Sequence, residues 1–161
     1  MVIFLEFWLP LIVWIFGFGF ISIKTKASIA DWFIKNSKLP QYLNFFLLAS
    51  PLIIFEELLT CRPVISLECL PTTFPSFHIM LGGLYIFWRL TKLSYLKTAL
   101  LFGIFGAFNE MIILGKHFIL PIHISILFWI LVIPIYSLIS LIPLYYLERS
   151  SFDILSPHVQ N

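Results

Sequence analysis

The chain has 161 residues, of which 60% are hydrophobic and 11% charged, with a formal net charge of +2 and a mean hydropathy of +1.00. Soluble domains carry about a quarter charged residues, so this composition excludes an ordinary water-soluble domain. The small positive excess lies in short loops and gives no case for nucleic acid. Membrane-crossing segments of about 20 residues would consume most of the length. The sequence therefore predicts one integral membrane domain, residues 1–161, in a membrane that the sequence does not specify.

Five apolar segments, each bounded by charges, prolines or polar turns, are predicted to cross the bilayer as helices. They are residues 3–23, 43–60, 77–91, 97–115 and 122–146. The last segment contains Pro134 and Pro143, which favour a kinked or tilted helix that ends near Glu148 and Arg149. The predicted fold class is all-α, a polytopic transmembrane helical bundle.

Basic residues in the loops predict the orientation, because short cytoplasmic loops carry an excess of Lys and Arg. The first and third loops hold seven of them: Lys24, Lys26, Lys35, Lys38, Arg89, Lys92 and Lys97. The second and fourth loops hold only Arg62 and Lys116. This asymmetry predicts an N-terminus outside and a C-terminus inside.

The first loop contains a short amphipathic segment. Ser28 and Asp31 have the spacing of a capping box, with Asp in place of the usual Glu or Gln. Ile29, Trp32 and Phe33 form an apolar stripe beside the lysines. The pattern predicts a short helix in the headgroup region.

The second loop, residues 61–76, is predicted to be external and irregular, because three prolines interrupt it. Its two cysteines, Cys61 and Cys69, would face a non-cytoplasmic compartment, where disulfides persist. Two interpretations stay open. The cysteines form a disulfide that staples the loop, or they are unpaired thiols that act as small hydrophobes at the membrane edge.

Small residues recur every four positions in the fourth predicted span, at Ala99, Gly103 and Ala107, with Gly106 beside them. A stripe of this kind lets the backbone of another helix approach closely. It predicts a packing face rather than a reactive one.

In the predicted topology, most side chains with catalytic or ligating capacity lie at one depth, near the outer face. They are Glu56 and Glu57 near the end of the second span, Asn109 and Glu110 near the end of the fourth, and His78 and His123 at the starts of the third and fifth. The glutamate pair lies about 5 Å below the end of its helix. Ionisable groups within membrane segments are costly and usually functional, so we interpret these residues as a polar site.

Glutamate and histidine are ligands of divalent metal ions and also form proton-transfer pairs. The candidate ligands of a divalent metal are Glu57, His78, Glu110 and His123. Glu56 and Glu57 are about 100° apart around a helix, so one can act as ligand or base while the other orients a partner. A structural hydrogen-bond cluster stays an alternative, because a glutamate near a helix end can reach toward water.

Three short segments carry a family resemblance: Glu56-Glu57-Leu58-Leu59-Thr60-Cys61-Arg62, Phe74-Pro75-Ser76-Phe77-His78 and Phe105-Gly106-Ala107-Phe108-Asn109. Their order resembles the EExxxR, FxxxH and HxxxN motifs of the CPBP family of intramembrane proteases, which includes CAAX prenyl endopeptidases. The resemblance covers about residues 50–115; Arg62 lies one residue too far along, and Phe105 stands where the family has histidine. It implies that Glu56 or Glu57 activates a water for peptide hydrolysis, with His78 and Asn109 stabilising the oxyanion.

The sequence leaves three functions open. The favoured one is a non-catalytic membrane protein, such as a subunit or assembly factor, that contacts the lipid bilayer and a membrane-protein partner or further copies of itself. The second is an intramembrane hydrolase of peptide or lipid, with Glu56, Glu57, His78 and Asn109 as its catalytic residues. The third is a proton- or metal-coupled carrier, which is weaker because five spans without an internal repeat suit alternating access poorly.

Overall fold

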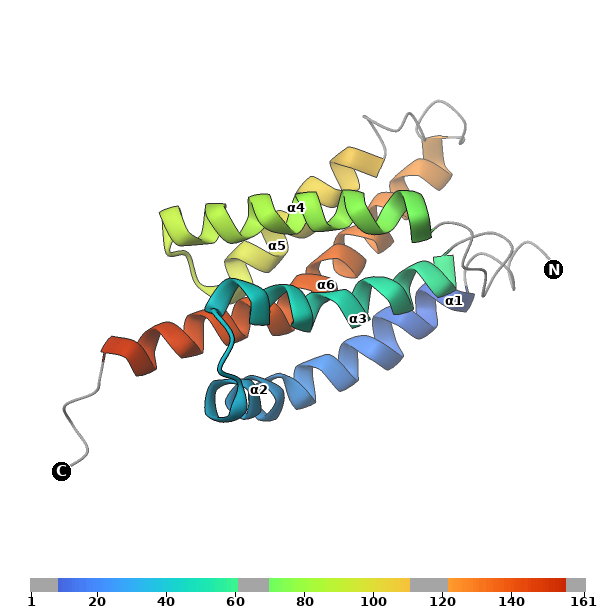
Figure 1. Cartoon of the computed structure of the whole chain (residues 1–161). Coiled ribbons are helices and arrows are strands. Elements are labelled where there is room, and N and C mark those ends of the chain that lie inside the picture. Colours follow the sequence, from blue (N-terminus) through green and yellow to red (C-terminus); the bar gives the residue numbers. More distant parts are fainter. Residues whose placement is uncertain (1–8, 61–69, 111–121, 156–161) are drawn as a thin grey trace.

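The computed structural model describes residues 9–60, 70–110 and 122–155, and within these ranges the chain forms helices and no strand (Figure 1). The elements are α1 (Leu9–Ile12), η2 (Val13–Phe18), α2 (Gly19–Asn36), α3 (Gln41–Thr60), α4 (Leu70–Thr91), α5 (Tyr95–Phe108) and α6 (Ile122–Leu155). Element η2 is a π-helical stretch that joins α1 to α2 without a break. The predicted all-α fold class is confirmed.

The long helices run alternately between two ends of the molecule (Figure 1). The α2–α3 turn, the α4–α5 turn and the end of α6 lie at one end, which we call the basic end. Its turns are flanked by Lys35, Lys38, Arg89, Lys92 and Lys97. The ends of α3 and α5 and the starts of α4 and α6 lie at the opposite end, which we call the acidic end.

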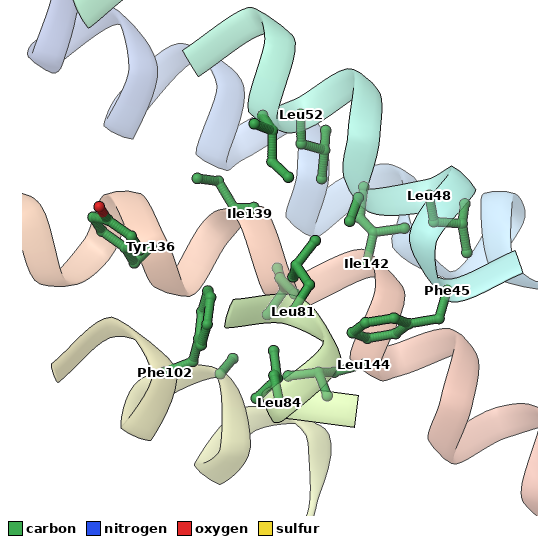
Figure 2. Close-up of a cluster of buried hydrophobic side chains, with 14 of the residues drawn as sticks. Phe45, Leu48, Leu52, Leu81, Leu84, Phe102, Tyr136, Ile139, Ile142 and Leu144 are labelled. Atoms are coloured by element: carbon green, nitrogen blue, oxygen red, sulfur yellow. The ribbon is translucent and has the colours of Figure 1, made fainter. Parts of the chain in front are cut away.

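Helix α6 is central, because it packs against α5, α2 and α3, while α4 packs against α3. The apolar core lies between these helices (Figure 2). Its buried side chains include Phe45, Leu48 and Leu52 of α3, Leu81 and Leu84 of α4, Phe102 of α5, and Ile139, Ile142 and Leu144 of α6. Tyr136 lies at one edge of this core (Figure 2).

The small-residue stripe of α5 forms its contact with α6, as predicted. Ala99, Gly103, Gly106 and Ala107 are all buried. A Cβ atom at Gly103 would collide with the Ile133 carbonyl oxygen, and one at Gly106 would collide with the Tyr136 ring. The two backbones therefore approach as closely as they do because these positions lack side chains.

Helix α4 ends where Lys92 adopts a left-handed conformation, with φ of 53°. The Lys92 N–H still donates to the Trp88 carbonyl at 2.9 Å, which closes the last turn. The Lys92 ammonium lies 4.8 Å from the centroid of the Trp88 ring. A left-handed residue after a helix is a common termination, and it lets the chain reverse into α5.

Three predicted boundaries were wrong: the start of a separate helix at Ser28, the start of the third predicted span and the end of the fifth. Ser28 does not cap a separate helix, since α2 continues unbroken to Asn36. Residues 70–76, assigned to the external loop, already belong to α4. Proline is tolerated in the first turn of a helix, where its missing N–H has no intrahelical partner, so Pro71 does not prevent the early start.

Helix α6 also continues beyond its predicted end, through Arg149 to Leu155. Contacts with the rest of the fold hold this extension. The Gln41 amide donates to the Ser150 hydroxyl at 2.6 Å, and the Arg149 guanidinium lies 3.5 Å from an Asp31 carboxylate oxygen.

Cys61 and Cys69 lie outside the described residues, so both interpretations of the cysteines stay open.

By length and composition, two helices in the described part of the chain could cross a membrane: Val13–Asn36 and Trp129–Ser151. The shorter helix Tyr95–Phe108 is also strongly apolar. These helices are weakly consistent with the predicted membrane location.

Candidate functional site: an acidic cluster around Tyr136

Tyr136 of α6 is the centre of the candidate site. Its side chain is only 4% exposed, and its hydroxyl donates to Glu110 Oε1 at 2.9 Å. The ring stacks on Phe77 of α4 at a centroid distance of 5.3 Å and meets Phe102 of α5 at 6.0 Å. Aromatic packing and the space left by Gly106 thus hold the phenol in one orientation.

Two further buried carboxylates, on α3, act electrostatically on the same hydroxyl. Glu56 and Glu57 are 7% and 5% exposed, although both lie near the end of their helix. Both are close enough to Tyr136 for their charges to act on its hydroxyl, as does that of Glu110. We call Glu56, Glu57, Glu110 and Tyr136 the acidic cluster. None of its three carboxylates is without an interaction partner.

Glu110 reaches the cluster because the helical path continues past α5. Asn109 keeps helical backbone angles, with φ of −58° and ψ of −48°, and its N–H points to the carbonyls of Gly106 and Phe105. Glu110 continues this wider π-type turn and is half-buried. This continuation of the helix brings the Glu110 carboxylate to the Tyr136 hydroxyl, and the common depth of these residues in a membrane stays a prediction.

His78 has its own set of contacts. Its Nδ1 lies 2.7 Å from the Phe74 carbonyl oxygen, and its Nε2 lies 3.0 Å from the Ser50 hydroxyl oxygen. The Phe46 ring stacks on it with a centroid distance of 5.9 Å, and the Phe74 ring lies 4.1 Å away. A carbonyl only accepts hydrogen bonds, so Nδ1 carries a proton.

The Ser50 hydroxyl lies between the His78 ring and a backbone carbonyl of α3. Its oxygen also lies 2.8 Å from the Phe46 carbonyl oxygen, and the hydroxyl has one proton to donate. If Ser50 donates to Phe46, Nε2 of His78 must donate to Ser50, and the imidazole is cationic. If Ser50 donates to Nε2 instead, the imidazole is neutral.

The structure brings together some of the predicted site residues and separates another. Glu110 bonds to Tyr136, the charges of Glu56 and Glu57 act on the same hydroxyl, and Asn109 is the neighbour of Glu110 in the chain. His78 is bonded to Ser50, which precedes Glu57 by seven residues, about 10 Å along the axis of α3. The neighbouring Phe77, rather than His78, contacts Tyr136.

The metal prediction gains no support from the described residues, which contain no group of three or more His, Cys, Asp or Glu side chains able to hold a metal ion. The fourth proposed ligand, His123, is in the first turn of α6, and its side chain lies outside the described set. The catalytic and metal-binding roles stay predictions.

Sequence reasoning missed Tyr136, although one signal was available. Tyr136 carries a hydroxyl within the apolar run of the last predicted span, and a stripe of small residues on α5 requires a large partner opposite. The two observations together could have paired Tyr136 with Gly106.

Sequence reasoning also missed a second polar cluster, at the basic end. Asn44 is 1% exposed and donates to the Tyr146 hydroxyl at 2.9 Å and to the Leu39 carbonyl at 3.3 Å. Its side-chain oxygen accepts from the Ser37 hydroxyl at 2.7 Å. We call Ser37, Asn44 and Tyr146 the neutral network. It ties the α2–α3 turn to α6.

Comparisons with protein-family models, with curated proteins and with solved structures found no match to this chain. The functional assignment therefore depends on the geometry alone.

Proposed function

We propose that this chain is a small multi-pass integral membrane protein in which the α1–η2–α2 rod, α3, α4, α5 and α6 each cross the bilayer. The supporting observation is that large apolar side chains cover the outside of the helices, whereas small residues and the two glutamates of α3 lie inside. On α5, the exposed side chains include Leu100, Leu101, Ile104, Phe105 and Phe108. The buried face of the same helix consists of Thr98, Ala99, Phe102, Gly103, Gly106 and Ala107. A surface helix of a soluble protein shows the opposite pattern.

The other helices extend the apolar exterior. Phe16 of η2 is 71% exposed, Ile79 of α4 is 77% exposed, and Ile130 of α6 is 60% exposed. Soluble monomers rarely expose contiguous apolar patches larger than a few hundred Å². Lipid is the solvent that suits a surface of this kind while Glu56 and Glu57 lie inside.

We propose that the basic end faces the cytoplasm. Four lysines and one arginine lie in or beside the α2–α3 and α4–α5 turns. Positive residues of membrane proteins concentrate on the cytoplasmic side. The acidic cluster would then lie within the opposite leaflet, close to the non-cytoplasmic surface.

Insertion and orientation can be tested by extraction and labelling. The protein should stay in the membrane pellet at alkaline pH. After Cys61→Ser and Cys69→Ser, a Lys38→Cys variant in intact cells should react with a membrane-impermeant maleimide only after permeabilisation. A Pro71→Cys variant should react before it. Release at alkaline pH would contradict insertion, and the reverse labelling order would contradict the orientation.

We further propose that the protein is a non-catalytic component of a membrane assembly, a subunit or assembly factor, with the acidic cluster as its functional polar site. The cluster is a costly feature that core packing does not require. His78, which hydrolysis would require beside the glutamates, is bonded to Ser50 instead.

Purification in a mild detergent tests this role. The wild type should retain a stable partner protein or further copies of itself, and Glu56→Gln/Glu57→Gln should lose that association without losing insertion. The half-buried Glu148 near the end of α6 provides a matched control, since Glu148→Gln leaves the cluster intact. A monomer without a partner would sink the assembly role.

An intramembrane hydrolase is the second candidate, favoured by two observations. Glu56 and Glu57 form a buried glutamate pair, and the Phe74 and His78 rings, four residues apart as in an FxxxH motif, are in contact. In proteoliposomes, this candidate predicts cleavage of a prenylated peptide that is lost in Glu57→Gln and retained in Glu148→Gln. Equal activity in the wild type and in both Glu56→Gln and Glu57→Gln would exclude it.

A further inference from the structure

A groove of about 850 Å³ lies between the η2–α2 rod, α5 and α6, away from the acidic cluster. Phe16 and Phe20 line it from the rod, Leu100 from α5, and Leu138 from α6. Phe16 is 71% exposed, Phe20 62% and Leu100 54%, so described parts of the chain leave this apolar wall largely uncovered.

The polar residues of the groove gather at its basic end. Lys26 of α2 lines the groove there together with Tyr95 and Lys97 of α5. Ser137 lies further along the groove, and none of the described lining residues is acidic. The groove therefore combines a long apolar wall with two cations at one end.

The ammonium of Lys26 is held in place by its surroundings. Its Nζ donates to the Ile23 carbonyl at 3.0 Å and lies 5.8 Å from the centroid of the Tyr145 ring. Lys97 is exposed at the beginning of α5. Lys24 adds a third positive charge nearby, with its Nζ 5.6 Å from the centroid of the Phe20 ring.

The length of the groove matches one leaflet of a bilayer. Ile15 and Lys26 both line it, and they are separated by eleven residues of continuous helix, about 16 Å along the axis. The hydrocarbon core of a bilayer is about 30 Å thick, so one leaflet contributes about 15 Å. An acyl chain that begins at the level of the lysines would thus extend to the far end of the groove.

We propose that this groove binds an anionic phospholipid, with the headgroup phosphate between Lys26 and Lys97 and one acyl chain along the apolar wall. Basic pockets between membrane helices on the cytoplasmic side bind anionic headgroups, and the apolar stems of the lysines extend the wall. A zwitterionic phospholipid fits less well, because its cationic amine would lie near the lysines without a carboxylate partner in the described lining. This inference rests on the membrane location proposed above.

Native mass spectrometry of the full chain in detergent tests the headgroup. Phosphatidylglycerol should bind at least about tenfold more tightly than phosphatidylcholine with the same acyl chains, since each lysine near an anionic surface contributes about fivefold. Lys26→Gln/Lys97→Gln should abolish the preference. The matched control is Lys35→Gln/Lys38→Gln, which removes two exposed lysines of the basic end that do not line the groove. Equal binding of the two lipids by the wild type, or equal loss in both double variants, would overturn the proposal.

A second pair of variants tests the acyl-chain wall. Leu100→Trp narrows the groove, whereas Ile104→Trp changes an exposed position of α5 outside it. Bound phosphatidylglycerol should decrease several-fold in the first variant and stay unchanged in the second. The same loss in both variants would contradict occupation of the groove.

Flotation with phosphatidylcholine vesicles separates the two proposals. If the wild type floats but shows no preference for phosphatidylglycerol in mass spectrometry, the lipid site is wrong and the membrane location stands. If it does not float with vesicles of either lipid, the proposed membrane location is wrong and the lipid site is wrong with it.

Discussion

The neutral network and the acidic cluster both include side chains of α3 and α6, but they lie at opposite ends of these helices and differ in charge. At the basic end, the neutral network centres on Asn44, whose side chain makes three hydrogen bonds without any charge. At the acidic end, the Tyr136 phenol donates to one carboxylate, Glu110, and the charges of Glu56 and Glu57 also act on it. Buried neutral groups contribute stability once they are hydrogen-bonded, whereas buried charges are expensive even when paired. The neutral network therefore suits a structural role, and the functional role of the acidic cluster is the part of our proposal that this comparison leads us to test.

The largest expected effect comes from breaking the α5–α6 contact beneath the acidic cluster. Gly106→Val places side-chain atoms into the Tyr136 ring and should lower the free energy of unfolding by about 3 kcal/mol. Thermal unfolding in detergent measures it. Gly83→Val on α4 is the matched control, because a Cβ there meets nothing within 4 Å and the midpoint should stay unchanged. Equal losses in both variants would contradict the close contact.

The neutral network should come next. Asn44→Leu leaves the buried Tyr146 hydroxyl and the half-buried Ser37 hydroxyl without their partner and should cost about 2 kcal/mol in the free energy of unfolding. Asn36→Leu is the control, since Asn36 is exposed and its side chain donates to the Trp32 carbonyl of its own helix. If the control is as destabilising as Asn44→Leu, the network does not fasten the bundle.

Tyr136→Phe should separate stability from function. It removes the hydrogen bond to Glu110 but keeps the ring, so the free energy of unfolding should fall by only about 1 kcal/mol. Partner retention in mild detergent should nevertheless be lost. Tyr145→Phe keeps the edge-on packing of its ring against Tyr95 and should retain the partner. Full retention in Tyr136→Phe would argue that the phenol is only structural.

The smallest effect is expected at the surface of the basic end. The Asp31 and Arg149 side chains are 44% and 53% exposed and lie 3.5 Å apart. Asp31→Asn should change the free energy of unfolding by less than about 0.5 kcal/mol, and the difference should vanish in high salt. A loss as large as that of Asn44→Leu would show that charge, rather than the neutral network, holds this end together.

The acidic cluster was partly predictable because depth follows from residue position along a helix. Alternating predicted spans placed Glu56, Glu57 and Glu110 at one level, and in the structure the charges of all three act on Tyr136, with Glu110 in direct hydrogen bond. The rotation of each helix about its axis was not predictable. Phe77 and His78 differ by about 100° around α4, and it is Phe77 that faces Tyr136.

The packing of α5 was predictable for a different reason. Glycines at Gly103 and Gly106 predict by themselves that another helix packs closely there, because a position without a side chain lets a neighbouring backbone approach. The extension of α6 beyond Arg149 could not be predicted from local residues. It is held by contacts such as the Gln41–Ser150 hydrogen bond, which joins residues 109 positions apart in the sequence.

The hydroxyl of Ser50 has a spectroscopic consequence. The Ser50 hydroxyl lies 2.8 Å from the Phe46 carbonyl oxygen and 3.0 Å from His78 Nε2, so it connects the imidazole to a backbone carbonyl of α3. A ¹³C label at the Phe46 carbonyl would separate the amide I infrared band of this carbonyl from those of the other residues. Ser50→Ala removes the hydrogen bond to this carbonyl and should shift the labelled band, which gives the side-chain contact a direct spectroscopic readout.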